Sequence, residues 1–257
     1  MRLRLPLILL CLLAFAACRK KDVQPSAAAA IPDFGQGTGR CRLHHVTQRK
    51  VVSNNQLGQT TELYLEYFGD GRIRSVTDVG TGLLLFTTGT SFTYSGDTIF
   101  AAHEGGVYGV DTVVLNARKQ IFRTIGLRPE DGSVFQYDAA GLLVTIGFPA
   151  PFQYFKWEDG DVIEDSVSSG ASQYQTFYTY YPDRLFQYAN VDVLNIYGTW
   201  GMPMFKTKHL RKSLLTASGS EIETFTYGFD ADGKVVADTS WQAGYIQACR
   251  TFEYECL

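Results

Sequence analysis

The side chains that could carry out acid–base chemistry or bind a metal ion are few and scattered. Four histidines occur, at positions 44, 45, 103 and 209, without the H-x-x-x-H or HExxH spacing of a zinc site. If His44 and His45 lie on a strand, they point to opposite faces and cannot bind one ion together. No G-x-S-x-G elbow, P-loop or dinucleotide fingerprint occurs either. We therefore expect structural histidines, with no catalytic residue, metal site or cofactor.

Closely spaced carboxylates are the second candidate for chemistry. Glu158, Asp159 and Asp161 form one group, and Glu164 and Asp165 form another. A glycosidase needs two carboxyl groups about 5 to 9.5 Å apart across a cleft. Neighbours in sequence at the tip of a hairpin are more often solvated turn residues, and we expect that here.

The stretch DADGK, residues 230–234, resembles the start of a calcium-binding loop. A complete loop continues with a third oxygen ligand and carries a glutamate at position twelve. Lys234 follows directly here and the glutamate is missing. The stretch therefore predicts a hairpin turn.

Three tryptophans are candidates for stacking on a ligand. Trp157 lies next to an expected turn, while Trp200 and Trp241 lie in or near irregular stretches. Flat rings at a rim suit stacking on sugars, so the three could line a glycan site. The alternative is that they pack in the core or in cross-strand pairs.

The cysteines allow one disulfide bond. After Cys18 there remain Cys41, Cys249 and Cys256, so at least one thiol stays unpaired. Cys249 and Cys256 differ by an odd number and would face opposite sides of one strand. We favour a bond from Cys41 to Cys256, which would join the first strand to the last; the alternative is no bond.

The first seventeen residues read as a signal peptide, with Arg2 and Arg4 before an apolar run too short for a transmembrane helix. Ala16-Ala17 before Cys18 resembles a bacterial lipobox, which implies that Cys18 is acylated and anchors the chain to a membrane. The alternative is an ordinary secretory signal with a chance cysteine. Residues 18–40 are rich in Ala, Gly, Pro and polar residues, which predicts a lipidated flexible tether before one domain at 41–257.

The charge of the mature chain argues against a nucleic-acid partner. Removing the two signal-peptide arginines changes the net charge of the full chain, −3, to −5. Nucleic-acid binding proteins usually carry a basic patch instead.

A hairpin motif recurs along the domain. An aromatic residue stands four positions before each of Gly71, Gly141 and Gly233, and an aliphatic residue follows two positions after each. These glycines lie 70 and 92 residues apart, close to three and four units of about 23 residues. Asp-x-x-Gly suits a type I turn followed by a residue with positive φ, which glycine adopts without strain. We therefore predict that these three glycines are turn residues of a repeated hairpin.

Four degraded copies of the motif fall near the expected places, at residues 92–100, 113–122, 154–163 and 177–186. No stretch combines a 3.6-residue apolar period with caps at both ends. Residues 201–218 come nearest to a helix, and we expect only a short turn or loop there.

The pattern within the strands predicts a sheet with one wet face. In TELYLEY, residues 61–67, Leu63 and Leu65 share one side and Glu62 and Glu66 share the other. Charge on that face argues against the wall of an outer-membrane barrel, whose lipid face must be apolar. Apolar residues at both +2 and +5 after the turn glycines indicate a bulge or a strongly coiled sheet. We predict an all-β fold: a long antiparallel up-and-down meander of hairpins, rolled into an open barrel-like sheet.

The phrases FQYDAAGLLVTIG (135–147) and YGFDADGKVVADT (227–239) resemble the Tyr-Asp (YD) repeats of Rhs-type proteins. The lipobox, the start CRLHHVT and the closing FEYEC are similar to Bacteroides-type lipoproteins of unknown function. That resemblance implies a porin-like, rolled antiparallel sheet and brings no catalytic residues.

These observations together favour a non-catalytic binding module of the cell envelope, anchored through Cys18 and most simply in the outer membrane. Its ligand or partner would be a glycan or an envelope protein. A structural scaffold is the second hypothesis, and an enzyme of an unrecognised type is the third.

Overall fold

The computed structural model describes residues 41–52, 56–70, 72–82, 84–105, 109–126, 132–147, 151–169, 172–185 and 207–256. The expected signal peptide and tether, with Cys18, lie outside these ranges, as do Gly71 and Trp200. No helix within the described ranges is long and apolar enough to cross a membrane.

The described chain folds into sixteen β-strands. They are β1 (Cys41–Val52), β2 (Gln56–Tyr67), β3 (Ile73–Gly82), β4 (Phe86–Ser95), β5 (Thr98–Glu104), β6 (Gly109–Leu115), β7 (Ile121–Ile125), β8 (Ser133–Tyr137), β9 (Leu143–Gly147), β10 (Pro151–Glu158), β11 (Asp161–Ser169), β12 (Ser172–Leu185), β13 (His209–Thr216), β14 (Glu221–Phe229), β15 (Val235–Gln242) and β16 (Tyr245–Cys256).

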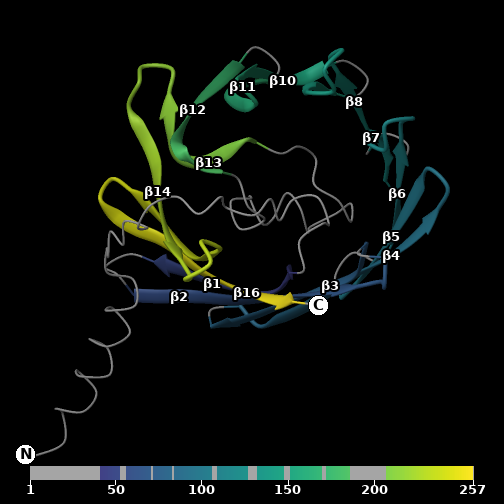
Figure 1. Ribbon diagram of the computed structural model, residues 1–257, viewed down its shortest axis with the longest axis horizontal. Coiled ribbons are helices and arrows are strands. Elements are labelled where there is room, and N and C mark those ends of the chain that lie inside the picture. The colour runs from purple at the N-terminus through teal and green to yellow at the C-terminus, as the bar shows by residue number, and fades with distance from the viewer. Residues whose placement is uncertain are drawn as a thin grey trace, which may run out of the picture.

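The strands form one closed antiparallel barrel in which each strand pairs with its neighbours in sequence. Strand β1 pairs with β16 and completes the ring, which Figure 1 shows with β1, β2 and β16 on one side and β8 to β11 across from them. The predicted all-β antiparallel meander is confirmed. The sheet is closed rather than open, so it presents no unpaired edge to another chain.

Turns from even to odd strands lie at one end of the barrel, where the expected glycine geometry is present. Gly141 has φ +88° and Gly233 has φ +80°, and the amide of each donates to the carbonyl three residues earlier. The Asp138 carboxylate accepts from the Leu142 amide at 2.8 Å, and Asp230 accepts from Lys234 in the same way. Both sites are therefore the predicted hairpin turns.

The predicted irregularity beside these turns is also present. The pairing register shifts between Glu66 and Tyr67, between Gln136 and Tyr137, and between Gly228 and Phe229. Such bulges rotate the strand, so apolar residues with odd spacing return to the same face.

Two sequence expectations near the long β12 strand are wrong. The hairpin turn expected within residues 177–186 is not present in the described part, 177–185, because β12 runs through Pro182 and ends at Leu185. Its pairing with β13 skips from Tyr180 to Leu185, an irregularity that accommodates a residue without an amide hydrogen. Residues 201–218 contain a strand, β13, rather than only a loop.

The core lies on the inward face of the barrel, at the end that carries these turns. Every odd strand contributes one aliphatic residue to a ring there, each at most 8% exposed. The members are Leu43, Ile73, Ile99, Ile121, Leu143, Val162, Leu210 and Val235. Seven even strands add a second ring: Leu65, Phe92, Val113, Phe135, Phe155, Phe225 and Phe252.

Beside these rings, aromatic side chains donate hydrogen bonds to backbone carbonyls of the neighbouring strands. The Tyr94 hydroxyl donates to the Ile73 carbonyl at 2.9 Å and the Tyr137 hydroxyl to the Ile121 carbonyl at 2.8 Å. Trp157 Nε1 and the Tyr254 hydroxyl make the equivalent bonds, to Leu143 and Val235. Burial raises the pKa of Tyr94 and Tyr137 to about 12. The aromatic residue before each of these turns thus stabilises the barrel wall, by packing and by a cross-strand hydrogen bond.

The outward face carries charged side chains, alongside exposed apolar ones such as Phe122 and Tyr154. Glu66, Arg74, Lys156 and Glu253 are exposed and alternate with buried apolar residues on their strands. A lipid-facing wall would lose about 2–4 kcal/mol for each Arg or Lys near the middle of a bilayer. The charged residues on this face argue against a wall that faces lipid throughout.

A disulfide bond joins Cys41 to Cys256, the pair that the sequence favoured. We call this end of the barrel the disulfide end. The bond joins β1 to β16 at the end where other neighbouring strands are joined by turns. Cys249 forms no disulfide within the described residues, and its Sγ accepts a hydrogen bond from Thr239 Oγ1 at 3.8 Å.

Candidate functional site

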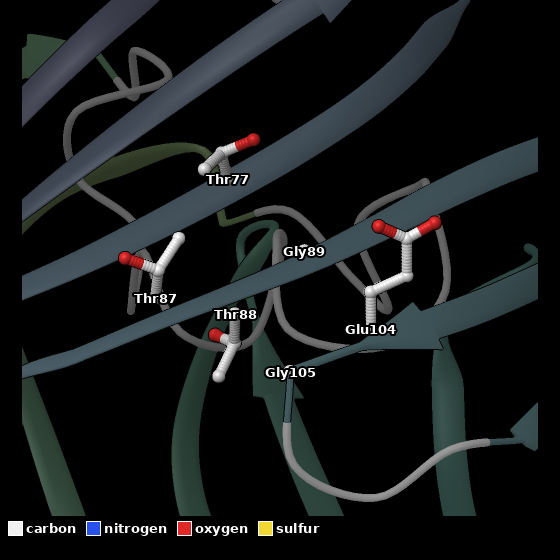
Figure 2. Close-up of a pocket in the computed structure, with 6 residues that line it drawn as sticks. All are labelled: Thr77, Thr87, Thr88, Gly89, Glu104 and Gly105. Carbon is white, nitrogen blue, oxygen red and sulfur yellow. The ribbon is translucent and has the colours of Figure 1, made fainter.

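A hollow in the described structure lies on the outer wall, toward the end opposite the disulfide. It measures about 560 Å³ and is lined by Thr77, Thr87, Thr88, Gly89, Glu104 and Gly105. Figure 2 shows Thr77 and Glu104 on the strands to either side of Gly89. We call this feature the Gly89 hollow.

Strand register explains the hollow. Thr77 of β3 pairs with Gly89 of β4, which pairs with Glu104 of β5, so the three form one row. Gly89 and Glu104 each lie three residues from an inward side chain, Phe92 and Ala101, and therefore face outward. The missing side chain at Gly89 leaves a gap in a row that is otherwise filled.

Gly105 closes one side of the hollow and needs to be glycine. Its φ is +87°, and an added Cβ would lie 2.3 Å from the Thr87 carbonyl oxygen. At Gly89, in contrast, the nearest atom to an added Cβ is Glu104 Cβ, at 3.9 Å. The space above Gly89 is therefore open, and the strand backbone does not itself require glycine.

Glu104 gives the hollow its electrostatic character. It is exposed, and within the described residues its carboxylate makes no hydrogen bond or ion pair. Thr77 and Thr87 also direct their side chains to this face. The hollow thus offers one anionic acceptor and hydroxyl groups, a set suited to hydrogen bonds with a polar ligand.

A second polar cluster lies on the inward face. Thr90 Oγ1 is 3.0 Å from His103 Nδ1, and His103 Nε2 is 3.2 Å from Asp111 Oδ2. The order hydroxyl, imidazole, carboxylate matches that of a nucleophile, a base and a group that orients the base. These hydrogen bonds link three adjacent strands, β4, β5 and β6, and involve both ring nitrogens of His103.

Asp78 is an unusual member of this inward polar region. Its Oδ1 atom is buried and has no hydrogen-bond partner. Burial raises the pKa of Asp78, against the opposing charge of Lys50. A buried oxygen without a hydrogen bond lowers the stability of the fold, so the Asp78 carboxylate is unfavourable for folding.

The other histidines also take part in cross-strand contacts. His45 Nε2 lies 2.6 Å from Glu62 Oε2, and its Nδ1 lies 3.4 Å from Glu253 Oε2 across the β1–β16 pair. His209 contacts the buried Asp161 carboxylate at 2.7 Å. No group of three His, Cys, Asp or Glu in the described ranges could hold a metal ion.

The carboxylate groups noted in the sequence do not form a paired site. Glu158 and Asp159 are exposed at the β10–β11 turn, whereas Asp161 is buried against His209. Glu164 accepts from Ser166 and Gln175, and Asp165 from Gln153 and Tyr178. The Asp230 turn is held by its own backbone amides.

The candidate tryptophans do not share one surface in the described structure. Trp157 lies on the inward face of β10, where its indole donates to Leu143. Trp241 lies on β15 and its indole contacts Thr226 Oγ1 at 3.4 Å. The strands β11 to β14 separate them along the barrel.

Sequence reasoning missed the Gly89 hollow. Its signal is a glycine within the hydroxyl-rich strand FTTGTSFTYS, residues 86–95. Glycine inside a strand often marks a close approach of another molecule or backbone. Glu104 carries no signal of its own, because it is brought beside Gly89 only by strand register.

Comparison with known proteins supports the fold. No protein-family model matches the sequence, and no curated protein matches it. A crystal structure of a porin-like protein from Bacteroides uniformis ATCC 8492 is similar with a TM-score of 0.61 and 16% identity, over 84% of this chain and 98% of that one.

Two further solved structures are similar at lower TM-scores. A porin-like protein from Bacteroides vulgatus ATCC 8482 matches with a TM-score of 0.36 and 14% identity, over 84% of this chain and 99% of that one. TcdB2-TccC3 without its hypervariable C-terminal region matches with a TM-score of 0.32 and 11% identity, over 82% of this chain and 14% of that one. The barrel of this chain is therefore of the kind seen in the Bacteroides uniformis porin-like protein.

Proposed function

We propose that this chain is a non-catalytic binding protein of the cell envelope, held at the outer membrane by lipid on Cys18, and that the Gly89 hollow is its ligand site. The observation that carries the proposal is the hollow itself. It brings together hydroxyl groups and the Glu104 carboxylate, which has no hydrogen bond or ion pair within the described residues, around an open space on a wall that carries other exposed charges.

The position of the hollow suits an anchored receptor. The chain enters the barrel at Cys41, at the disulfide end, and the hollow lies near the end of β5, toward the opposite end. A tether at one end leaves the other end accessible. Acyl chains contribute about 0.8 kcal/mol per buried methylene, so two or three chains make such an anchor effectively permanent.

Anchoring is tested by Cys18→Ser in the full chain. We expect the wild-type protein in the membrane fraction, with a mass that includes acyl groups, and the variant without them. Cys249→Ser is the control because it removes a cysteine of the described barrel that forms no disulfide and leaves Cys18 intact. An unacylated wild-type chain would refute the anchor.

Ligand binding at the hollow is tested with Gly89→Val. Valine suits a strand, and a Cβ at this position meets only ordinary contacts, so the variant should fold. Ser95→Val, on the same strand and face but outside the hollow, is the matched control. Any ligand that raises the melting temperature of wild type and Ser95→Val should do so less in Gly89→Val.

A scaffold role is the second candidate, favoured by large apolar side chains on the outer wall. Phe122 of β7 is 49% exposed and Tyr154 of β10 is 46% exposed. Isolated exposed aromatics are common on monomers, so a protein partner is the weaker proposal. Cross-linking that depends on these two residues would favour it.

A further inference from the structure

The Gly89 hollow continues along the outer wall toward an exposed aromatic ring. Phe100 lies four residues before Glu104 on β5, on the same outward face, and is 38% exposed. At about 3.3 Å per residue, the two residues lie about 13 Å apart along the strand. We call the surface from Glu104 to Phe100 the outer strip.

The floor of the outer strip is made of small side chains. Between its two ends, Ala102 pairs with Ser91, and beside Glu104 the neighbouring position is Gly89. The ring of Phe100 and the carboxylate of Glu104 therefore stand at the ends of a shallow floor. On its other side Ala102 pairs with Val110 of β6, which is 49% exposed, so the floor has an aliphatic border and can receive an extended, flat ligand.

The chemistry of the two ends differs, and this restricts the ligand. A carboxylate with neighbouring threonine hydroxyls forms hydrogen bonds with adjacent hydroxyl groups of a ligand. An exposed phenylalanine offers an apolar face and no polar group. A pyranose ring has both features, with hydroxyl groups at its edge and C–H groups on its face.

A cationic ligand explains less of the surface. An ammonium group would pair with Glu104, but it would leave the floor and Phe100 without a role at about 13 Å from the charge. Only one of the six residues that line the hollow is charged, and the other five are threonine or glycine. This set resembles a surface for hydroxyl groups more than one for a strong cation.

We propose that the outer strip binds a short neutral oligosaccharide, with sugar hydroxyls on Glu104 and Thr77 and a sugar ring stacked on Phe100. This inference rests on the proposed ligand-binding function and names the ligand class for that site. No bond is made or broken.

The experiment measures binding of the full chain to an array of neutral α- and β-linked oligosaccharides of glucose, mannose, xylose and N-acetylglucosamine, followed by calorimetry with the best binder. Nα-acetyl-lysine amide serves as the cationic probe. The variants are Gly89→Val, Glu104→Gln and Phe100→Ala. The matched controls are Ser95→Val, Glu158→Gln and Phe122→Ala, which change exposed residues of the wall outside the strip.

We expect an oligosaccharide to bind wild type and all three controls alike. Glu104→Gln should weaken binding about tenfold, because hydrogen bonds to a charged group contribute more than neutral ones. Phe100→Ala should weaken it by a similar factor, and Gly89→Val should abolish it. Circular dichroism and melting temperature establish that each variant folds.

The remaining outcomes separate the ligand class from the proposed function. Sugar binding that none of the three variants weakens would overturn the outer strip and leave a binding protein. Binding of the lysine probe instead, lost in Glu104→Gln, would overturn the sugar class and leave the hollow as the ligand site. If neither the oligosaccharides nor the lysine probe bind, both the sugar class and the hollow as the ligand site are overturned.

Discussion

Breaking the bond between Cys41 and Cys256 should lower the stability of the barrel about as much as a large side-chain truncation in its core. The two cysteines are 215 residues apart in sequence, so the bond closes a loop that contains nearly the whole domain. The entropy of closing a loop of this length in the unfolded chain corresponds to about 5 kcal/mol at 25 °C. That is comparable to the whole stability of many domains, about 5–15 kcal/mol.

The native barrel should nevertheless keep its closed shape without the bond. Strand β1 pairs with β16 from Cys41 to Lys50, and the Arg42–Glu255 ion pair at 2.9 Å crosses the same boundary. The effect of the bond therefore lies mainly in the unfolded state. For a domain of about 215 residues, 5 kcal/mol corresponds to a fall in melting temperature of about 10–20 °C.

The assay is urea unfolding of Cys41→Ser/Cys256→Ser, with Cys249→Ser as the control for loss of a thiol that forms no disulfide. The double variant should have near-wild-type circular dichroism without urea and a loss of about 3–5 kcal/mol in the free energy of unfolding. A loss below about 1 kcal/mol would refute the loop-entropy reasoning. A double variant without near-UV signal in water would refute the claim that strand pairing alone keeps the barrel closed.

Three further predictions concern the turns, the aromatic residues and the inward carboxylate. Gly141→Val should lower the free energy of unfolding by about 1–2 kcal/mol, because valine must adopt φ +88°, whereas Gly228→Ala, in ordinary contact with its neighbours and without positive φ, should change it little; chemical denaturation measures both. Burial raises the pKa of Tyr94 and Tyr137 to about 12, above the unfolded value of 10, so their contribution is complete below pH 10 and is lost as the pH rises from 10 through 12. Urea midpoints at pH 8, 10 and 11.5 should show this fall, and Tyr137→Phe should reduce it; an unchanged profile would contradict it. Asp78→Asn should raise stability at pH 7 by up to about 1 kcal/mol, because it removes a buried charge, and a clear loss in the same assay would contradict this.

Local features of the fold could be read from the sequence because each depends on a few neighbouring residues. The turn at Gly141 needs a residue that tolerates positive φ and an Asp that caps the turn, and both stand in the sequence at fixed spacing. The wet and dry faces of β2 follow from simple alternation. The turn predicted within residues 177–186 is wrong because the pairing of β12 with β13 overrides the local preference of the sequence.

Closure of the sheet and the Gly89 hollow could not be read in this way. Closure depends on the sum of registers and bulges around sixteen strands, to which each hairpin contributes only a small part. The hollow depends on Thr77, Gly89 and Glu104 falling in one row, and these residues come from three different strands. A register shift of one residue would turn Gly89 inward and remove the site.

The side-chain distribution decides what the porin-like fold means for this chain. A membrane barrel places apolar residues outside and polar residues inside, whereas this chain buries Leu65 and Phe135 inside and exposes Glu66 and Lys156 outside. The rings of buried aliphatic and aromatic side chains at the disulfide end also differ from the polar lining that a water-filled channel requires. Similarity of fold therefore does not carry the function of a pore to this chain.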